Sequence, residues 1–554
     1  MENSRIIQVM GESVTIPYGT TFAQLAKDYE KNFKARILLA KQKNRLRELN
    51  SEIRSDEDIC FYDIKNLDAM RVYRRGVSFL MIKAVKDLLG KKAKVVVEHS
   101  LHKSYYCEIR EEDFCLTQEF LDKLTARMKE LAEQDIPIVK HTMHRDEAIE
   151  LVRKFGMEDK ARLFRYRRTS TVNLYELDGF FDYFYGYMPP STGYVKDFQL
   201  MIYERGFLIR FPNQNNPSEI LPFHDPAKVS AVFMEQMNWC SLMGVDTVAD
   251  LNELICDGKF GDLIRINEAL HEKKVAEIAD AIYHKLDKVK VVLIAGPSSS
   301  GKTTFANRLC VQLRVLGIIP HTISLDDYFI DRELVPVDEF GKQDFESIER
   351  LDLKQFNEDL TKMIRGEAVE LPSYNFLTGK REYKGNVHQL KHGEIFVIEG
   401  IHGLNDRLTS SIAPENKFKV FVSAMTQLNV DDHNHISTVD SRLIRRIVRD
   451  HQFRGRDAAE TISTWNYVTR GEEENIFPFQ ENADMIFNSA TIYELSVLKP
   501  YIEPLLFKID DSMEEYPDAK RLIKFLHYFL SSNSDMIPNN SIIKEFVGGS
   551  CFKV

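Results

Sequence analysis

The chain has 554 residues, too many for one compact core, and at about 100–200 residues per domain it predicts three or four domains. Hydrophobic residues make up 44% and charged residues 29% of the chain, the ordinary composition of a globular protein. The formal net charge of -10 argues against a surface that binds nucleic acid throughout, although a local basic patch is compatible with it.

Cysteine usage predicts a reducing compartment. No two cysteines have CxxC spacing and their number is odd, which argues against a disulfide framework or a structural zinc site. The first residues lack the basic-then-apolar run of a signal peptide, and no apolar stretch approaches the roughly 18 residues that span a membrane. We therefore expect a cytoplasmic protein without a membrane partner. The seven cysteines are Cys60, Cys107, Cys115, Cys240, Cys256, Cys310 and Cys551.

The pattern along the chain predicts α+β units followed by an α/β unit. Residues 1–66 are expected to form a small β-rich module, and residues 67–215 a mixture of helices and strands. Residues 216–285 are expected to be a helical linker region. In residues 286–495 apolar strands and helices alternate, which predicts a domain with a parallel sheet. Residues 496–554 are expected to be a helical tail.

Local patterns mark individual elements. Ser13–Pro17 and Asp58–Tyr62 are expected to be short strands, and Thr21–Asn32 a helix with Thr21 as its N-cap. Gly76–Leu89 has apolar residues at helical spacing. In the tail, Leu522–Leu530 is the clearest helical pattern.

A phosphate-binding loop is the strongest motif. The string VKVVLIAGPSSSGKTTFANRLCVQL contains GxxxxGK[ST], with a buried strand before it and helical spacing after it. Glycines let backbone N–H groups turn toward one phosphate chain, and the following helix adds the positive end of its dipole. Lys302 is expected to reach the β- and γ-phosphates, and the Thr303 hydroxyl to hold Mg²⁺. The expected ATP-binding residues are Gly296, Ser298, Ser299, Ser300, Gly301, Lys302, Thr303 and Thr304.

Carboxylates follow two later strands. His321–Phe329 is expected to be a strand that ends in Asp326 and Asp327, either of which could accept a proton from a substrate hydroxyl or hold magnesium. The alternative is that Asp327 caps a helix. A third strand, Glu394–Ile398, leads into Glu399, where an acidic residue supports Mg²⁺; the alternative is an acidic turn residue.

An arginine-rich helix follows in the string SRLIRRIVRDHQFRGRD. Arg442, Arg445 or Arg446, and Arg449 fall on one helix face, and Arg454 and Arg456 follow. Five or six guanidinium groups downstream of a phosphate loop suggest a lid that neutralises charge during phosphoryl transfer. The alternative is a solvated basic helix.

Residues 288–490 resemble the uridine kinase and phosphoribulokinase family. The matching strings are GPSSSGKTT, SLDDYF, ELPSYNFLTGKREY, VIEGIHGL and RRIVRDHQFRGRD. The resemblance implies transfer of the ATP γ-phosphate to a sugar hydroxyl, the 5′ position in nucleosides. It implies that Asp326 is the catalytic base, that Lys302 and Arg449 are also catalytic, and that Glu399 assists magnesium. Arg446, Arg449, Arg454 and Arg456 would form the lid, and Glu346, Tyr374 and Arg446 would contact the acceptor.

Two positions depart from the pyrimidine-nucleoside pattern. In uridine kinases a histidine lies five residues after the tyrosine that corresponds to Tyr374, whereas this chain has Gly379. A glutamine that helps to hold the nucleoside is replaced by Thr464. A site built on hydrogen bonds discriminates sharply, so uridine or cytidine specificity is in doubt and another nucleoside or sugar is an open alternative.

The front half resembles parts of aminoacyl-tRNA synthetases. Residues 8–64 are similar to a TGS domain, a β-grasp module, through SVTIPYGTTFAQLAKDY and SDEDICFYD. Residues 67–212 are similar to the second additional domain of threonyl- and alanyl-tRNA synthetases, through MPPSTGYVKDF, YYCEI and RGVSFLMIKAVKDLL. The HxxxH and CxxxH pairs of that domain correspond to Arg75 and Phe79, and to Phe184 and Met188, so its metal ligands are missing.

This half is therefore expected to be catalytically dead and to serve as a binding or regulatory module. Aromatic residues between Phe180 and Tyr187 could stack on a base of RNA, but an aromatic core that fills the old metal site is the preferred interpretation. A metal site built from His99, His102, His141 and His144 is not expected.

Three functional hypotheses remain. The first is a small-molecule kinase that uses MgATP. The second is a nucleotide-hydrolysing regulator associated with RNA or ribosomes, which a TGS-like module favours; the absence of an NKxD-type string counts against GTP. The third, a pseudo-kinase scaffold, is weakened because Lys302, Thr303, Asp326 and Glu399 are all present. The sequence leaves the acceptor and the oligomeric state open, a homo-oligomer included.

Overall fold

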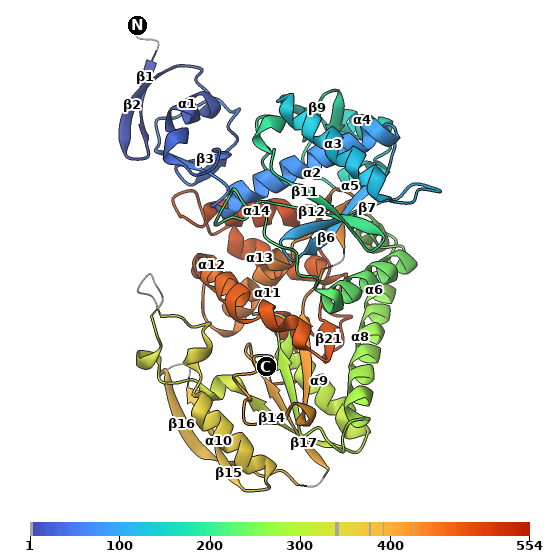
Figure 1. Ribbon diagram of the computed structural model, residues 1–554, viewed down its shortest axis with the longest axis vertical. Coiled ribbons are helices and arrows are strands. Elements are labelled where there is room, and N and C mark those ends of the chain that lie inside the picture. Colours follow the sequence, from blue (N-terminus) through green and yellow to red (C-terminus); the bar gives the residue numbers. More distant parts are fainter. Residues whose placement is uncertain (1–3, 338–342, 376–377, 392, 427, 554) are drawn as a thin grey trace.

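The computed structural model describes residues 4–337, 343–375, 378–391, 393–426 and 428–553. It shows a multidomain chain of mixed α+β and α/β architecture. A small N-terminal sheet lies at one end of the long axis, and a β-hairpin lies at the other end (Figure 1).

The N-terminal sheet has five strands in the order β2-β1-β5-β3-β4. Helix α1 (Phe22–Tyr29) packs on it and begins after Thr21, whose side chain accepts the backbone N–H of Gln24, so the predicted N-cap is confirmed. The helix is shorter than predicted, because a 3₁₀ turn replaces it at Glu30–Asn32. The strands are β1 (Ser4–Val9), β2 (Glu12–Pro17), β3 (Leu39–Gln42), β4 (Arg45–Arg47) and β5 (Ile59–Tyr62).

The next region surrounds helix α2 (Leu67–Leu89), which contains the predicted helix Gly76–Leu89 and is buried along most of its length. A four-stranded sheet, in the order β11-β12-β7-β6, and a three-stranded sheet, in the order β10-β9-β8, form with it a mixed α+β unit. The elements are β6 (Val95–Leu101), β7 (Ser104–Ile109), α3 (Gln118–Glu133), β8 (Val139–His144), α4 (Arg145–Lys154), α5 (Glu158–Arg165), β9 (Thr171–Leu177), β10 (Phe180–Asp182), β11 (Gln199–Tyr203) and β12 (Gly206–Arg210).

Three helices lead from there to the second half of the chain. They are α6 (Ala227–Met243), α7 (Val248–Cys256) and α8 (Phe260–Tyr283). Helix α8 runs beside the parallel sheet and packs on α9 (Figure 1).

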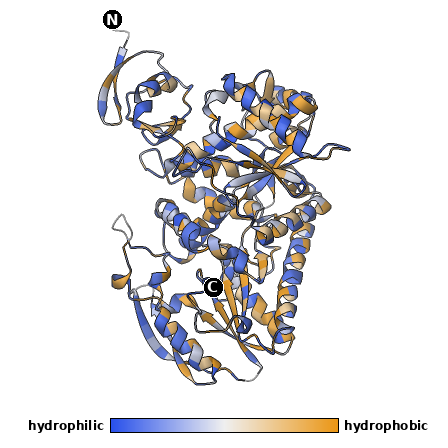
Figure 2. Ribbon diagram, viewed as in Figure 1, coloured by the Kyte–Doolittle hydropathy of each residue, from blue (hydrophilic) through white to orange (hydrophobic). Residues whose placement is uncertain are grey.

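The second half is built on a five-stranded sheet in the order β14-β17-β13-β18-β21, with all neighbours parallel. Every residue of the central strand β13 is buried, as expected of a strand covered on both faces. Hydrophobic residues line these central strands (Figure 2). The strands are β13 (Val291–Ala295), β14 (Ile319–Ser324), β17 (Glu394–Glu399), β18 (Lys417–Ser423) and β21 (Met485–Asn488).

Further elements surround this sheet. Two hairpins project from it: the first pairs β15 with β16, and the second, β19–β20, reaches the front half of the chain. Helices α11 and α12 lie above the carboxyl edge of the sheet (Figure 1). The elements are α9 (Lys302–Val315), α10 (Leu353–Ile364), β15 (Val369–Asn375), β16 (Lys380–His388), β19 (Asn429–Asp431), β20 (Asn434–His435), α11 (Thr438–Phe453) and α12 (Ala458–Asn475).

The C-terminal segment is less helical than predicted. Helices α13 (Glu494–Leu506) and α14 (Tyr516–Leu526) form, but residues 527–543 contain no helix, and α15 (Lys544–Val547) is one short turn. The expectation of a helix through Leu530 is therefore wrong beyond Leu526. Buried apolar side chains, not helical hydrogen bonds, hold this stretch: Tyr528, Phe529, Ile537 and Ile542.

Candidate active site

The phosphate loop connects β13 to the N-terminus of α9, as the sequence predicts. A Cβ atom on Gly296 would lie 1.9 Å from the carbonyl oxygen of Val422, so only glycine fits there. Gly301 has φ of +82°, in the left-handed region that glycine adopts without strain. The first turn of α9 therefore presents its free backbone N–H groups to the loop.

Two hydroxyl groups in the loop show that it fits a phosphate chain. The Oγ atoms of Ser299 and Ser300 are buried, and no described residue hydrogen-bonds to them. A buried hydroxyl without a partner is costly, and phosphate oxygens are suitable acceptors. Lys302 is folded back, so that its Nζ donates to the carbonyl oxygen of Pro297 at 3.1 Å. Burial lowers the pKa of Lys302, while Glu399 and Asp326 act in the opposite direction.

Other donors of the loop already have partners within the protein. The backbone N–H of Ser298 donates to Oε1 of Glu472 at 2.7 Å, and its Oγ atom accepts from Nη1 of Arg446 at 2.5 Å. The Thr304 hydroxyl donates to Oε2 of Glu545 at 2.7 Å. Ser298 and Thr304 are thus bound by residues from distant segments, which the local sequence did not reveal.

The predicted carboxylates lie at the carboxyl edge of the sheet. Strand β14 ends at Ser324, earlier than predicted, and Asp326 lies in the 3₁₀ turn that follows. Glu399 ends β17 opposite Ser324, whose hydroxyl donates to Oε1 of Glu399 at 3.3 Å. Burial and, to a smaller extent, the nearby Asp326 raise the pKa of Glu399 to about 7. Burial also raises the pKa of Asp326, opposed by Arg350 and by Lys302.

The two neighbouring aspartates have different surroundings. Oδ1 of Asp327 accepts the backbone N–H of Tyr374 at 3.0 Å, which fixes strand β15 against the site. Among the described residues, none donates a hydrogen bond to the carboxylate of Asp326. Within the described residues, the Asp326 carboxylate therefore has no donor of its own, whereas that of Asp327 is used by the backbone.

The arginines of α11 divide into two groups, which corrects the expectation of a lid with five or six members. Arg442 is fully buried and donates to both carboxylate oxygens of Glu472, at 2.6 and 2.8 Å. Arg445 is equally buried and pairs with Glu494 at 2.6 Å. Both guanidinium groups are bound by carboxylates within the protein, so they stabilise the domain beneath the loop.

The other arginines are more exposed than Arg442 and Arg445. Arg446 pairs with Asp450 at 2.6 Å, and Arg454, half exposed, lies 3.5 Å from the same carboxylate. The side chain of Arg456 is exposed, and its backbone N–H donates to the carbonyl oxygen of Asp450 at 3.2 Å. Burial and, to a smaller extent, the neighbouring Arg454 and Arg446 lower the pKa of Arg449 to about 9. Such crowding of cations favours an anionic ligand.

Glu346 and Tyr374 are the expected acceptor residues, and both interact electrostatically with Arg350. Burial raises the pKa of Glu346 to about 7, with Glu472 as a further cause. The ring of Tyr374, 6% exposed, packs edge-on against Phe329 with ring centroids 5.6 Å apart.

Arg350 also lies at the site, although no sequence motif indicates it. Its guanidinium carbon lies 3.6 Å from the ring centroid of Phe329, and its charge opposes the raised pKa of Asp326. Arg350 belongs to none of the quoted motifs, so only the fold reveals it.

The two departures from the pyrimidine pattern also have structural counterparts. Gly379 has φ of +70°, and a Cβ atom there would lie 2.8 Å from Cβ of Arg332, so a histidine does not fit without rearrangement. The Thr464 hydroxyl donates to the carbonyl oxygen of Glu460 within its own helix, at 3.1 Å. Phe376 and Leu377 of the same motif lie outside the described residues.

The lost metal motif of the front half now forms an aromatic core. Phe79 and Phe184 pack edge-on with ring centroids 5.2 Å apart. Nε of Arg75 donates to the carbonyl oxygen of Tyr187 at 2.9 Å, and Met188 is buried. The four positions carry two rings, a guanidinium and a thioether in place of imidazole and thiolate ligands. In the described part of the chain, no group of three or more histidine, cysteine, aspartate or glutamate residues could hold a metal ion.

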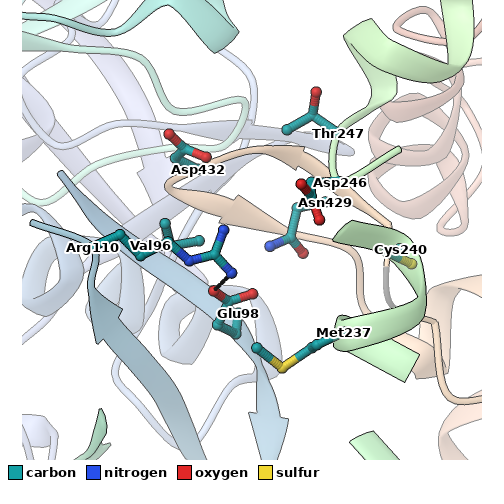
Figure 3. A pocket seen from close by; sticks show the side chains of 9 residues that line it. All are labelled: Val96, Glu98, Arg110, Met237, Cys240, Asp246, Thr247, Asn429 and Asp432. Carbon is teal, nitrogen blue, oxygen red and sulfur yellow. Dashed lines mark hydrogen bonds and ion pairs between the residues drawn. The ribbon is translucent and has the colours of Figure 1, made fainter. Parts of the chain in front are cut away.

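A small cavity marks the junction of the two halves (Figure 3). Arg110 and Glu98 lie next to each other in its lining, joined by a hydrogen bond of 2.6 Å, and burial raises the pKa of Glu98 to about 7. Asp432 pairs with Lys94 at 3.2 Å. The cavity is thus a polar part of the interface, and it is lined by Val96, Glu98, Arg110, Met237, Cys240, Asp246, Thr247, Asn429 and Asp432.

The second half of the chain is therefore an α/β domain of the phosphate-loop class, with carboxylates and arginines gathered at the carboxyl edge of its sheet. Residues 291–496 match the model of the Phosphoribulokinase / Uridine kinase family. The match confirms the resemblance for this part of the chain, and a kinase-family domain is present there.

Solved structures give weaker comparisons. A putative fructose transport system kinase from Silicibacter sp. TM1040 is 18% identical and covers 38% of this chain and 98% of its own, with a TM-score of 0.29. A possible uridine kinase from Bacillus stearothermophilus is 18% identical and covers 38% of this chain and 100% of its own, with a TM-score of 0.25. Both TM-scores lie below 0.5, too low to establish a shared fold.

The N-terminal part of the chain matches threonine–tRNA ligases. The protein from Geobacillus sp. (strain WCH70) is 30% identical over 201 residues, which is 36% of this chain and 31% of the relative. That from Syntrophotalea carbinolica is 29% identical over 181 residues, which is 33% of this chain and 28% of the relative. The chain thus spans about three tenths of the length of these relatives. Within its described residues, it has no helix both long and apolar enough to cross a membrane.

Proposed function

We propose that the chain is a MgATP-dependent phosphotransferase that moves the γ-phosphate to a sugar hydroxyl, in the first instance the 5′-OH of a nucleoside. The observation that carries the proposal is the meeting of three groups at one sheet edge. The phosphate loop follows β13, Asp326 follows β14, and the arginines of α11 lie beside both.

The residues have distinct roles in this proposal. The N–H groups of the loop and Lys302 bind the phosphates, and Thr303 and Glu399 hold Mg²⁺. Asp326 accepts the proton of the attacking hydroxyl. Arg446, Arg449, Arg454 and Arg456 neutralise charge on the transferred group, because guanidinium groups near a developing negative charge lower the barrier.

The acceptor is proposed to lie between Glu346, Tyr374 and Asp326. Gly379 and Thr464 supply no side chain that reads a pyrimidine base, since Gly379 has none and the Thr464 hydroxyl is used within its helix. We therefore do not restrict the nucleoside to uridine or cytidine.

One observation favours a second candidate. The match of the N-terminal part to threonine–tRNA ligases supports an RNA- or ribosome-associated regulator whose loop hydrolyses nucleotide, with RNA bound by the front half. In the kinase proposal, the same half is a binding or regulatory module.

One experiment separates the two candidates. The protein is incubated with MgATP and a panel of nucleosides and sugars, or with tRNA or ribosomes, and ADP and the phosphorylated product are followed. ADP that depends on an acceptor and matches phosphorylated product one to one supports the kinase. ADP that responds only to RNA supports the regulator.

A further inference from the structure

The last described segment of the chain returns to the phosphate loop. A Cβ atom on Gly301 would lie 2.6 Å from Cγ2 of Ile542, so Ile542 packs directly on the loop backbone. The ring centroid of Phe546 lies 5.1 Å from the guanidinium carbon of Arg445 in α11. Residues 541–547 therefore fill the space between the start of α9 and the arginine helix, and they lie beyond residues 291–496, which match the family model.

Glu545 places a carboxylate among the groups proposed to bind phosphate. Its Oε2 atom accepts the Thr304 hydroxyl at 2.7 Å, and its Oε1 atom lies 3.9 Å from Nη1 of Arg449. Its charge also acts on Lys302. Thr304 is 0% and Glu545 6% exposed, so the contact is closed to solvent.

A carboxylate with these partners imitates a phosphate. A hydroxyl has one hydrogen to donate, and that of Thr304 is taken by Glu545. Like charges brought together away from water repel strongly. The nucleotide phosphates and the Glu545 carboxylate therefore cannot both occupy the Thr304 side of the loop.

Polar contacts and apolar packing hold the segment, in which Ile542, Ile543 and Phe546 are fully buried. The Ser541 hydroxyl donates to Oε1 of Glu268 at 2.6 Å, and Nζ of Lys544 donates to the carbonyl oxygen of Ser534 at 3.0 Å. Helix α15 is a single turn, too short to be stable without its packing.

We propose that residues 541–547 are a built-in competitor of the nucleotide: the Glu545 carboxylate occupies the Thr304 hydroxyl in the place of a phosphate, and it must leave before the nucleotide is fully seated. The proposal rests on the nucleotide-binding part of the proposed function, and it does not depend on which acceptor is phosphorylated.

The first test measures the binding of a nonhydrolysable MgATP analogue to the full chain by calorimetry. Glu545→Gln removes the charge and keeps the size, so the dissociation constant should fall about tenfold or more. The matched control is Glu514→Gln, an exposed glutamate elsewhere in the C-terminal region, which should leave binding unchanged. Equal or weaker binding by Glu545→Gln, or no binding by either wild type or Glu545→Gln, would overturn the proposal.

The second test needs no variant. Hydrogen exchange of the amides of residues 541–547 is followed in the wild-type protein with and without a saturating MgATP analogue. A displaced competitor predicts at least about tenfold faster exchange with the analogue, because local opening exposes these amides. Unchanged or slower exchange would show that Glu545 stays and only positions Thr304. An absence of acceptor-dependent ADP, with both results as expected, would reject the proposed function alone.

Discussion

Glu472 of α12 accepts two hydrogen bonds from the Arg442 guanidinium, at 2.6 and 2.8 Å, and a third from the backbone N–H of Ser298 at 2.7 Å. One buried carboxylate thus joins both helices of the lid region to the phosphate loop. Because the Arg442 guanidinium satisfies the carboxylate from one side, the loop N–H on the other side is held in place.

Replacement of Arg442 by methionine is expected to destabilise this domain by about 3–5 kcal/mol, since it leaves a buried carboxylate uncompensated. Guanidinium unfolding followed by tryptophan fluorescence measures the change, because Trp465 lies in α12 beside Arg442. Arg265→Met, at an exposed ion pair, is the control and should change stability by less than about 1 kcal/mol. An equally small effect of both variants would contradict a structural role for the buried pair.

Asp326→Asn is expected to lower kcat by about 10²–10⁴-fold while nucleotide binding persists, because the amide cannot accept the proton of the hydroxyl. Asp327→Asn keeps an oxygen for the backbone N–H of Tyr374 and should retain most of the activity. Steady-state rates and calorimetric nucleotide binding measure both variants. Wild-type turnover by Asp326→Asn would remove Asp326 from the mechanism.

The magnesium requirement should depend on pH through Glu399. Its pKa is raised to about 7 by burial, so it is largely deprotonated above pH 7 and protonated below it. A proton then competes with Mg²⁺, and the Mg²⁺ concentration for half-maximal rate should rise about tenfold between pH 8 and pH 6. In Glu399→Gln this pH dependence should disappear, and the Mg²⁺ concentration for half-maximal rate should be higher and the same at each pH. If the Mg²⁺ concentration for half-maximal rate changes equally with pH in both proteins, a group other than Glu399 titrates.

A buried cluster joins the two halves of the chain. Nζ of Lys160 in α5 lies 3.1 Å from Asp431 and 3.3 Å from Asp182, and all three side chains are fully buried. Asp182 belongs to the front half and Asp431 to the β19–β20 hairpin of the second half. Lys160→Met should therefore uncouple the halves, because it leaves two buried carboxylates without their cation.

Differential scanning calorimetry tests this expectation. Uncoupled halves should unfold in two separate transitions, with the first at least about 5 °C below the wild-type transition. Lys123→Met, at an exposed i,i+4 pair of α3, is the control and should leave the transition in place. A single unshifted transition in Lys160→Met would mean that the cluster does not hold the halves together.

The sequence predicted the features whose signals are local. The phosphate loop occupies eight consecutive residues after a fully apolar strand, Asp326 lies two residues after β14, and Glu399 is the last residue of β17, so each has a local signal in the sequence. The Thr21 cap was equally local, since its partner Gln24 is three residues away.

The remaining features depend on contacts between distant segments. Thr304 and Glu545 are 241 positions apart, and Arg442 and Glu472 are 30 apart on different helices. Helical spacing placed Arg442, and Arg445 or Arg446, on one face of the helix with Arg449, but it could not show that Glu472 and Glu494 bind Arg442 and Arg445. The helical tail was predicted wrongly after Leu526 because its apolar residues serve packing against other elements, which a periodicity argument cannot distinguish from a helix.

The most direct test of the account measures ADP and phosphorylated product together, for the full chain with MgATP and a panel of nucleosides and sugars. We expect at least one uncharged acceptor with a sugar hydroxyl to raise ADP release and to yield one phosphorylated product per ADP. In Asp326→Asn, both the acceptor-dependent ADP and the phosphorylated product should be lost. ADP release that no acceptor changes, or that persists unaltered in Asp326→Asn, would contradict the account.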